Sequence, residues 1–70
     1  VKGEAADLDS NDNSKLFNLI RKNYVFDQLI WEFGDDNQPA WVHVSYKTTG
    51  NRNEVLKAVK ENGKTKYIRL

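Results

Sequence analysis

The chain has 70 residues, no cysteine, and a formal net charge of +1 from eleven basic and ten acidic side chains. A chain of this length forms one small domain, and without cysteine neither a disulfide nor a zinc ribbon can stabilise it. The balanced charge gives no reason to expect nucleic acid or an anionic membrane as a partner. No apolar run approaches the roughly 20 residues of a membrane helix.

The first part of the chain predicts a strand followed by a helix. Residues 2–8, "KGEAADL", are compatible with one strand. The polar cluster "DSNDNS" that follows favours a turn and a helix N-cap at Asp12 or Asn13. Beyond it, one helical face collects the apolar residues Leu16, Phe17, Leu19 and Ile20. We therefore expect a helix over residues 14–22.

The middle of the chain predicts two strands. The segments "VFDQLIWEF" (25–33) and "AWVHVSYK" (40–47) are rich in branched and aromatic residues, and the turn cluster "GDDNQP" separates them. They are expected to pair as an antiparallel hairpin with a long loop.

The C-terminal part admits two interpretations. "NEVLKAVKENG" could be a helix ended by Gly63, or a strand that turns at Asn62 and Gly63 into "TKYIRL". Asn-Gly is the strongest short hairpin signal, so the hairpin is favoured. The predicted fold class is α+β, a small antiparallel sheet with one helix packed on one face plus a C-terminal β-hairpin. Residues 1–70 are expected to form a single domain.

Strand alternation assigns the residues of the central hairpin to two faces. The apolar face should pack under the helix and comprises Leu29, Trp31, Phe33, Val42, Val44 and Tyr46. The opposite face carries Gln28, Ile30, Glu32, Trp41, His43 and Ser45. A carboxylate and the only histidine of the chain thus share one side of the hairpin. From the residues alone, a merely solvated sheet face is the more common explanation of such a pair.

Three segments, taken in order, resemble a known family. They are the Gly-x-Ala-x-Asp pattern at Gly3, Ala5 and Asp7, then "FDQLIWEF", then "WVHVS". Together they resemble the M15 family of zinc peptidases, the D-Ala-D-Ala carboxypeptidase and endolysin group, most clearly over residues 2–47. The first motif of that family is His-x-x-Gly-x-Ala-x-Asp, and the second is a histidine beside a tryptophan on a later strand.

The resemblance implies that Asp7 and His43 are zinc ligands. The histidine of the first motif, the family's third ligand, would fall immediately before Val1. The chain also lacks an initiating methionine. We therefore expect it to be the C-terminal portion of an M15-like catalytic domain, and to be inactive if that ligand is missing.

The resemblance further implies a catalytic carboxylate. Many relatives place an acid three residues before the later histidine, where this chain has Ala40, and we expect Glu32 to take its place as general base. Gln28, Trp41 and Ser45 share the predicted face and are candidate substrate-binding residues. The implied reaction is zinc-dependent cleavage of a peptide bond in the peptidoglycan stem at the bacterial cell wall, by a D-Ala carboxypeptidase or an endopeptidase.

Other functions stay open at this point. One is a metal-free module that binds cell-wall peptides or glycans, and another is a structural domain without a ligand. An edge strand near Val1 could pair between copies and give a homo-oligomer. A nucleic-acid partner is disfavoured, because acidic residues balance the C-terminal lysines Lys57, Lys60, Lys64 and Lys66. Trp41 could equally be a tryptophan packed at a sheet edge.

Overall fold

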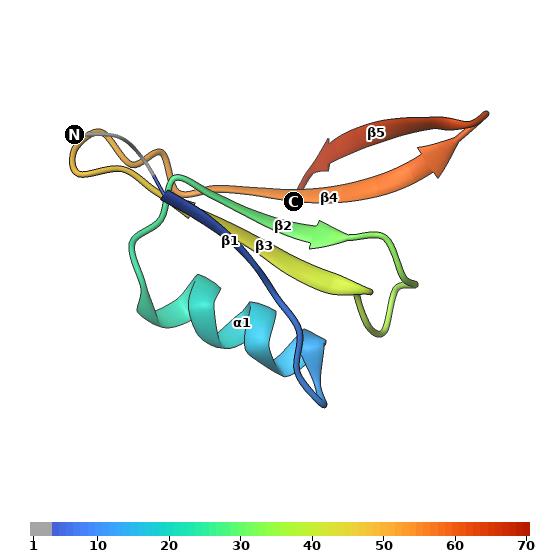
Figure 1. Cartoon of the computed structure of the whole chain (residues 1–70), viewed down its shortest axis with the longest axis horizontal. Coiled ribbons are helices and arrows are strands. Elements are labelled where there is room, and N and C mark those ends of the chain that lie inside the picture. Colours follow the sequence, from blue (N-terminus) through green and yellow to red (C-terminus); the bar gives the residue numbers. More distant parts are fainter. Residues whose placement is uncertain (1–3) are drawn as a thin grey trace.

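The computed structural model describes residues 4–70, which form a five-stranded sheet and one helix. The elements are β1 (Glu4–Leu8), α1 (Asn13–Asn23), β2 (Gln28–Glu32), β3 (Trp41–Tyr46), β4 (Glu54–Glu61) and β5 (Lys64–Arg69). In space the strands follow the order β1-β3-β2-β4-β5, and every neighbouring pair is antiparallel except β2 and β4, which are parallel. The helix packs on one face of the sheet, against β2 and β3 (Figure 1). The predicted α+β class is confirmed.

The helix α1 begins where the sequence predicts. Asp12 is the N-cap, and its Oδ1 accepts a hydrogen bond from the backbone N–H of Lys15 at 3.0 Å, which satisfies an amide that has no partner inside the helix. Phe17 and Ile20 are buried against the sheet, whereas Leu19 is 52 % exposed because the helix covers only part of that face. No helix within residues 4–70 is long and apolar enough to cross a membrane.

The hydrophobic core lies between α1 and the sheet. Its buried members are Phe17, Ile20, Phe26, Leu29, Trp31 and Val42. The ring of Phe17 meets that of Trp31 edge-on, with centroids 5.2 Å apart, a favoured geometry for aromatic pairs. The alternation predicted for Leu29, Trp31 and Val42 is therefore confirmed.

The prediction was wrong for Phe33. The strand β2 starts at Gln28 and ends at Glu32, not at residues 25 and 33. Phe33 then adopts a positive φ of 55°, which takes it out of the strand alternation. Its ring packs edge-on against Trp41 at 5.6 Å, and Lys60 lies over it at 5.5 Å. Phe33 is thus half-buried beside the face that carries Glu32, away from the helix.

The loop between β2 and β3 is tied to the start of the helix. Asn13 is buried, and its amide donates to the backbone carbonyls of Pro39 and Ala40 at 3.3 and 3.2 Å. The Oε1 of Gln38 accepts from the backbone N–H of Ser14 at 2.9 Å. These contacts fix the loop, and with it the register in which Glu32 faces the start of β3.

The crossover from β3 to β4 is anchored by a buried carboxylate. Asp27 accepts two hydrogen bonds of 2.8 Å from the guanidinium of Arg52, and its backbone N–H donates to the carbonyl of Ser45 at 2.7 Å. The hydrogen bonds from Arg52 hold the pKa of Asp27 well below its ordinary value, against the opposing effect of burial. This anchor sets β4 beside β2 in parallel, a pairing that the sequence did not predict.

The C-terminal hairpin is confirmed. Asn62 and Gly63 both have positive φ, 54° and 78°, as a type I′ turn requires. The turn joins β4 to β5, and the hairpin extends beyond the rest of the sheet (Figure 1). Part of its positive charge is neutralised, since Lys66 pairs with Glu61 at 3.4 Å.

Candidate functional site

Asp7 and His43 lie directly opposite each other on β1 and β3. Because opposed residues of an antiparallel pair project to the same face, their side chains meet above the sheet. Asp7 Oδ1 is 2.9 Å from His43 Nδ1, and the side chains are 65 % and 27 % exposed. In this arrangement Nδ1–H donates to the carboxylate, which orients the ring and leaves Nε2 for another partner.

Glu32 lies on the same face beside this pair. His43 is paired with Ile30, two residues before Glu32, so Glu32 and His43 are diagonal neighbours about 7–8 Å apart at their Cα atoms. Glu32 is only 8 % exposed, and burial raises the pKa of its carboxyl. The imidazole of His43 opposes this rise and the carboxylate of Asp7 adds to it. A carboxyl with a raised pKa is suited to accept and release a proton closer to neutral pH.

A hollow of about 390 Å³ opens beside Glu32 and His43. Its lining consists of Gln28, Ile30, Glu32, His43, Leu56 and Tyr67. The paired residues Ile30 and Leu56 contribute apolar surface. Glu32, Ala58 and Tyr67 follow one another across β2, β4 and β5. Only the small side chain of Ala58 therefore separates the strand positions of Glu32 and Tyr67.

Sequence reasoning missed Leu56 and Tyr67. Both lie on the C-terminal hairpin, whose place in the sheet depends on the parallel pairing of β4 with β2. The sequence predicts that "TKYIRL" forms a strand but assigns Tyr67 to no face of the sheet. Nothing in the sequence related that strand to the face of His43.

The three candidate substrate-binding residues lie on the predicted face, but the polar groups of two of them are already hydrogen-bonded within the sheet. The amide of Gln28 donates to Glu54 Oε1 at 2.7 Å, and the Oγ of Ser45 accepts from the backbone N–H of Gln28 at 3.0 Å. These groups hold β2, β3 and β4 together. Trp41 is 36 % exposed at the end of β3, with one edge against Phe33, so part of its ring is open to a ligand.

The donor atoms of Asp7 and His43 suit zinc, which binds imidazole nitrogen and carboxylate oxygen at about 2.0–2.2 Å. Two ligands of one tetrahedral ion at those distances lie roughly 3.3 Å apart. Oδ1 and Nδ1 are 2.9 Å apart and share the Nδ1 proton, which His43 would have to release before both atoms could bind one ion. Within residues 4–70, however, no group of three metal-ligating side chains is brought together. The described residues therefore bring together one imidazole and one carboxylate, and not the three ligands of a complete zinc site.

No protein-family model, curated protein or solved structure matches this chain. The chemistry of the site is therefore inferred from its own geometry and from the motif resemblance of its residues.

Proposed function

We propose that this chain carries part of the active site of a zinc-dependent peptidase of the M15 type. The observation that supports the proposal best is the meeting of Asp7 and His43 at 2.9 Å beside a nearly buried glutamate. The motif resemblance assigns the ligand roles to these same two residues and implies a third ligand, a histidine directly before Val1.

The proposed roles follow from the positions of the side chains. Zinc would supply Lewis acidity toward the scissile carbonyl and lower the pKa of water to about 7. Asp7 and His43 would hold the ion. Glu32 accepts the proton of the attacking water and returns it to the leaving amine, a transfer that its raised pKa favours.

The hollow beside Glu32 is the proposed place of the substrate. Its surface combines the apolar side chains of Ile30 and Leu56 with the amide of Gln28 and the phenol of Tyr67, a mixture that suits a peptide. By resemblance, the substrate is the peptidoglycan stem peptide, cleaved by a D-Ala carboxypeptidase or an endopeptidase.

Hydrolysis of stem peptides tests this proposal. The protein would be this chain with a single histidine added before Val1, loaded with zinc, and the products would be followed by mass spectrometry. Glu32→Gln should lower the rate by about 10²–10⁴-fold while zinc stays bound. Glu61→Gln, on the exposed hairpin, is the matched control and should leave the rate unchanged. Zinc bound without hydrolysis of any stem peptide would refute the peptidase.

A metal-free module that binds cell-wall peptides or glycans is the second candidate. It is favoured by the presence of only two suitable ligands at the site within the described residues. Under that function, muropeptides bind in the presence of a chelator and are never cleaved. Loss of binding on chelation would exclude the module.

A further inference from the structure

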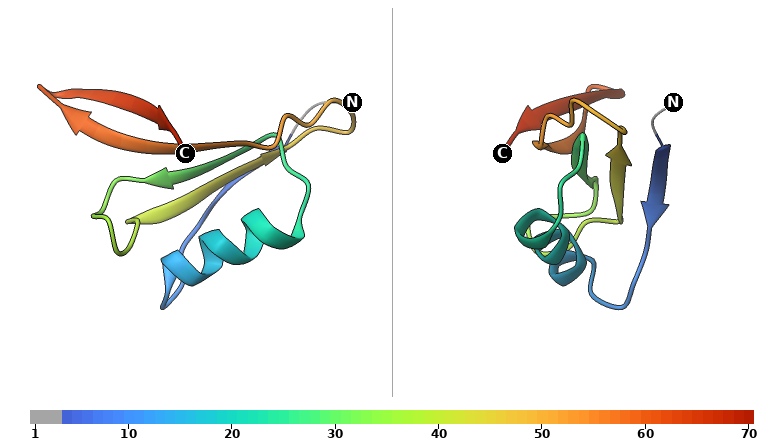
Figure 2. Two further views of the ribbon diagram at one scale, coloured as in Figure 1. Left: turned by 180° about the vertical axis from the view of Figure 1, so that it is seen from behind. Right: turned by 90° about the vertical axis from the view of Figure 1, so that its left-hand side faces the viewer.

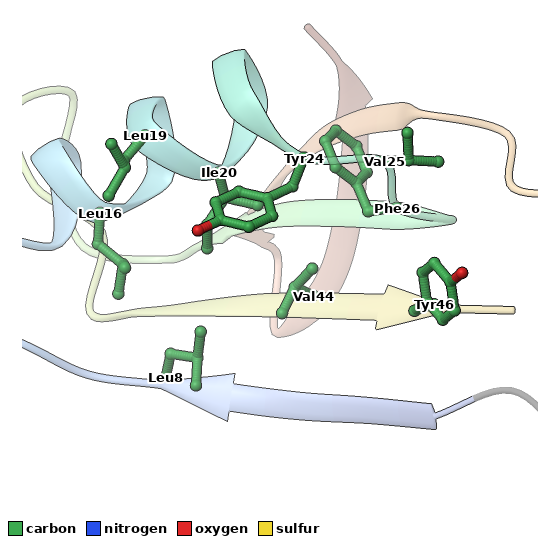
Figure 3. Close-up of a pocket in the computed structure, with 9 residues that line it drawn as sticks. All are labelled: Leu8, Leu16, Leu19, Ile20, Tyr24, Val25, Phe26, Val44 and Tyr46. Atoms are coloured by element: carbon green, nitrogen blue, oxygen red, sulfur yellow. The ribbon is translucent and has the colours of Figure 1, made fainter.

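An apolar groove runs along the helix on the face of the sheet opposite the candidate site. Its volume is about 310 Å³. Figure 3 shows the side chains that line it, with α1 and the segment after it on one side and the strands β1 and β3 on the other. Its main surfaces come from Leu8, Leu16, Leu19, Tyr24, Val44 and Tyr46. Leu19, Tyr24 and Tyr46 are each more than half exposed, which is unusual for a cluster of large apolar side chains.

The groove lies beside α1, over β1 and the adjoining part of β3. A helix is about 10 Å wide and strands are about 4.8 Å apart, so one helix covers roughly two strands. The helix α1 contacts β2 and β3, and β1 stands clear of it at the edge of the sheet (Figure 2, right). An added strand would extend the sheet edge beside β1 and leave the groove open. A helix lying over β1 alongside α1 would fill it.

The positive charge of α1, which forms one side of the groove, favours an acidic partner. Lys15 and Lys22 lie four residues before and three residues after Leu19, on the same stripe of α1. The helix has no acidic residue. We infer that this groove binds an amphipathic helix of a partner polypeptide, with an apolar stripe toward Leu8 and Leu19 and acidic residues along the flank that faces α1.

A second copy of this chain does not have that chemistry. Its only helix within residues 4–70 is α1, whose exposed polar side chains include Lys15, Asn18, Arg21 and Lys22 and no acidic residue. Two copies of α1 placed side by side would also oppose their lysines and arginines, which disfavours the contact. The inference concerns the face away from Asp7 and His43, so it stands or falls independently of the proposed peptidase.

Titration of the isotope-labelled chain with a synthetic peptide tests the inference. The probe is a capped helix of about 14 residues with leucines at i, i+3, i+4 and i+7 and glutamates on one flank. We expect amide shifts at Leu8, Leu19 and Tyr46. A peptide with lysines in place of the glutamates should bind at least about tenfold more weakly.

Leu19 and Ile68 are both exposed aliphatic residues. Replacing each of them by serine gives a test variant and its control. Leu19→Ser should weaken binding of the acidic peptide about tenfold or more, since it removes an apolar contact within the groove. Ile68→Ser, on the exposed strand β5, should leave it unchanged. Circular dichroism of both variants checks that they remain folded.

Three results would overturn the inference. They are absence of binding at millimolar peptide, equal binding of the acidic and basic peptides, and shifts confined to other surfaces. A concentration-dependent dimer that Leu19→Ser abolishes would also overturn it, because the occupant would then be a second copy.

Discussion

The loop that follows Glu32 should depend on a glycine that no other residue can replace without strain. Gly34 has a φ of +70°, and a Cβ added there would meet the backbone carbonyl oxygen of Gln38, and the backbone N of Ala40 at 2.7 Å. Backbone atoms held in a tied loop cannot move aside easily. Gly34→Ala therefore incurs both the cost of the left-handed conformation, about 1–2 kcal/mol, and a steric cost of similar size or greater.

Gly50 offers a matched control for this substitution. It has a φ of +75°, and a Cβ added there meets nothing within 4 Å. Gly50→Ala should thus incur only the left-handed cost of about 1–2 kcal/mol. A chain of this length is stable by roughly 4–10 kcal/mol in total, so the difference between the two variants is large enough to measure.

Thermal unfolding followed by circular dichroism is the assay. At about 4–8 °C per kcal/mol, Gly50→Ala should lower the midpoint by roughly 5–15 °C. Gly34→Ala should lower it by at least about twice as much. Equal midpoints for the two variants would refute the reasoning, because the loop would then have room for a methyl group beside Gln38.

Three further predictions concern single side chains. Burial raises the pKa of Glu32, so its charged form destabilises the folded state, and the protein loses stability as the pH rises above the ordinary pKa of 4.5. Glu32→Gln should therefore raise the unfolding midpoint at neutral pH but not in acid, whereas the exposed Glu61→Gln should change it at neither pH. The low pKa of Asp27 beside Arg52 contributes stability above its ordinary value of 3.8 that is lost as pH falls; Asp27→Asn should lower the midpoint at neutral pH and flatten its decline in acid. Leu29 is fully buried, so Leu29→Ala should cost about 2–5 kcal/mol in urea unfolding, and a smaller loss would contradict its place in the core.

Local patterns were sufficient to predict the helix, the central hairpin and the C-terminal turn. Each depends on residues close together in the chain, such as the cap at Asp12 or the positive φ values at Asn62 and Gly63. The parallel pairing of β2 with β4 was not predictable, because the two strands lie far apart in the chain and no local pattern relates them. The contact between Asp27 and Arg52 joins the segments that precede these strands.

Part of the candidate site was also predictable from the sequence. Alternation placed Glu32 and His43 on one face, and the motif pointed to Asp7, which the register brings opposite His43. Tyr67 could not be placed, since its position depends on the pairing of β4 with β2. Phe33 was assigned to the wrong face because a single left-handed residue interrupts the alternation.

Zinc bound per chain after dialysis tests the central proposal most directly. The measurement would compare the chain with one histidine added before Val1, the same chain with His43→Ala, and the chain without the added histidine. We predict about one zinc per chain for the first and little for the other two, since three protein ligands are needed for tight binding. If the chain with the added histidine binds no zinc, or if His43→Ala leaves its zinc content unchanged, Asp7 and His43 are not a metal site and the peptidase is excluded.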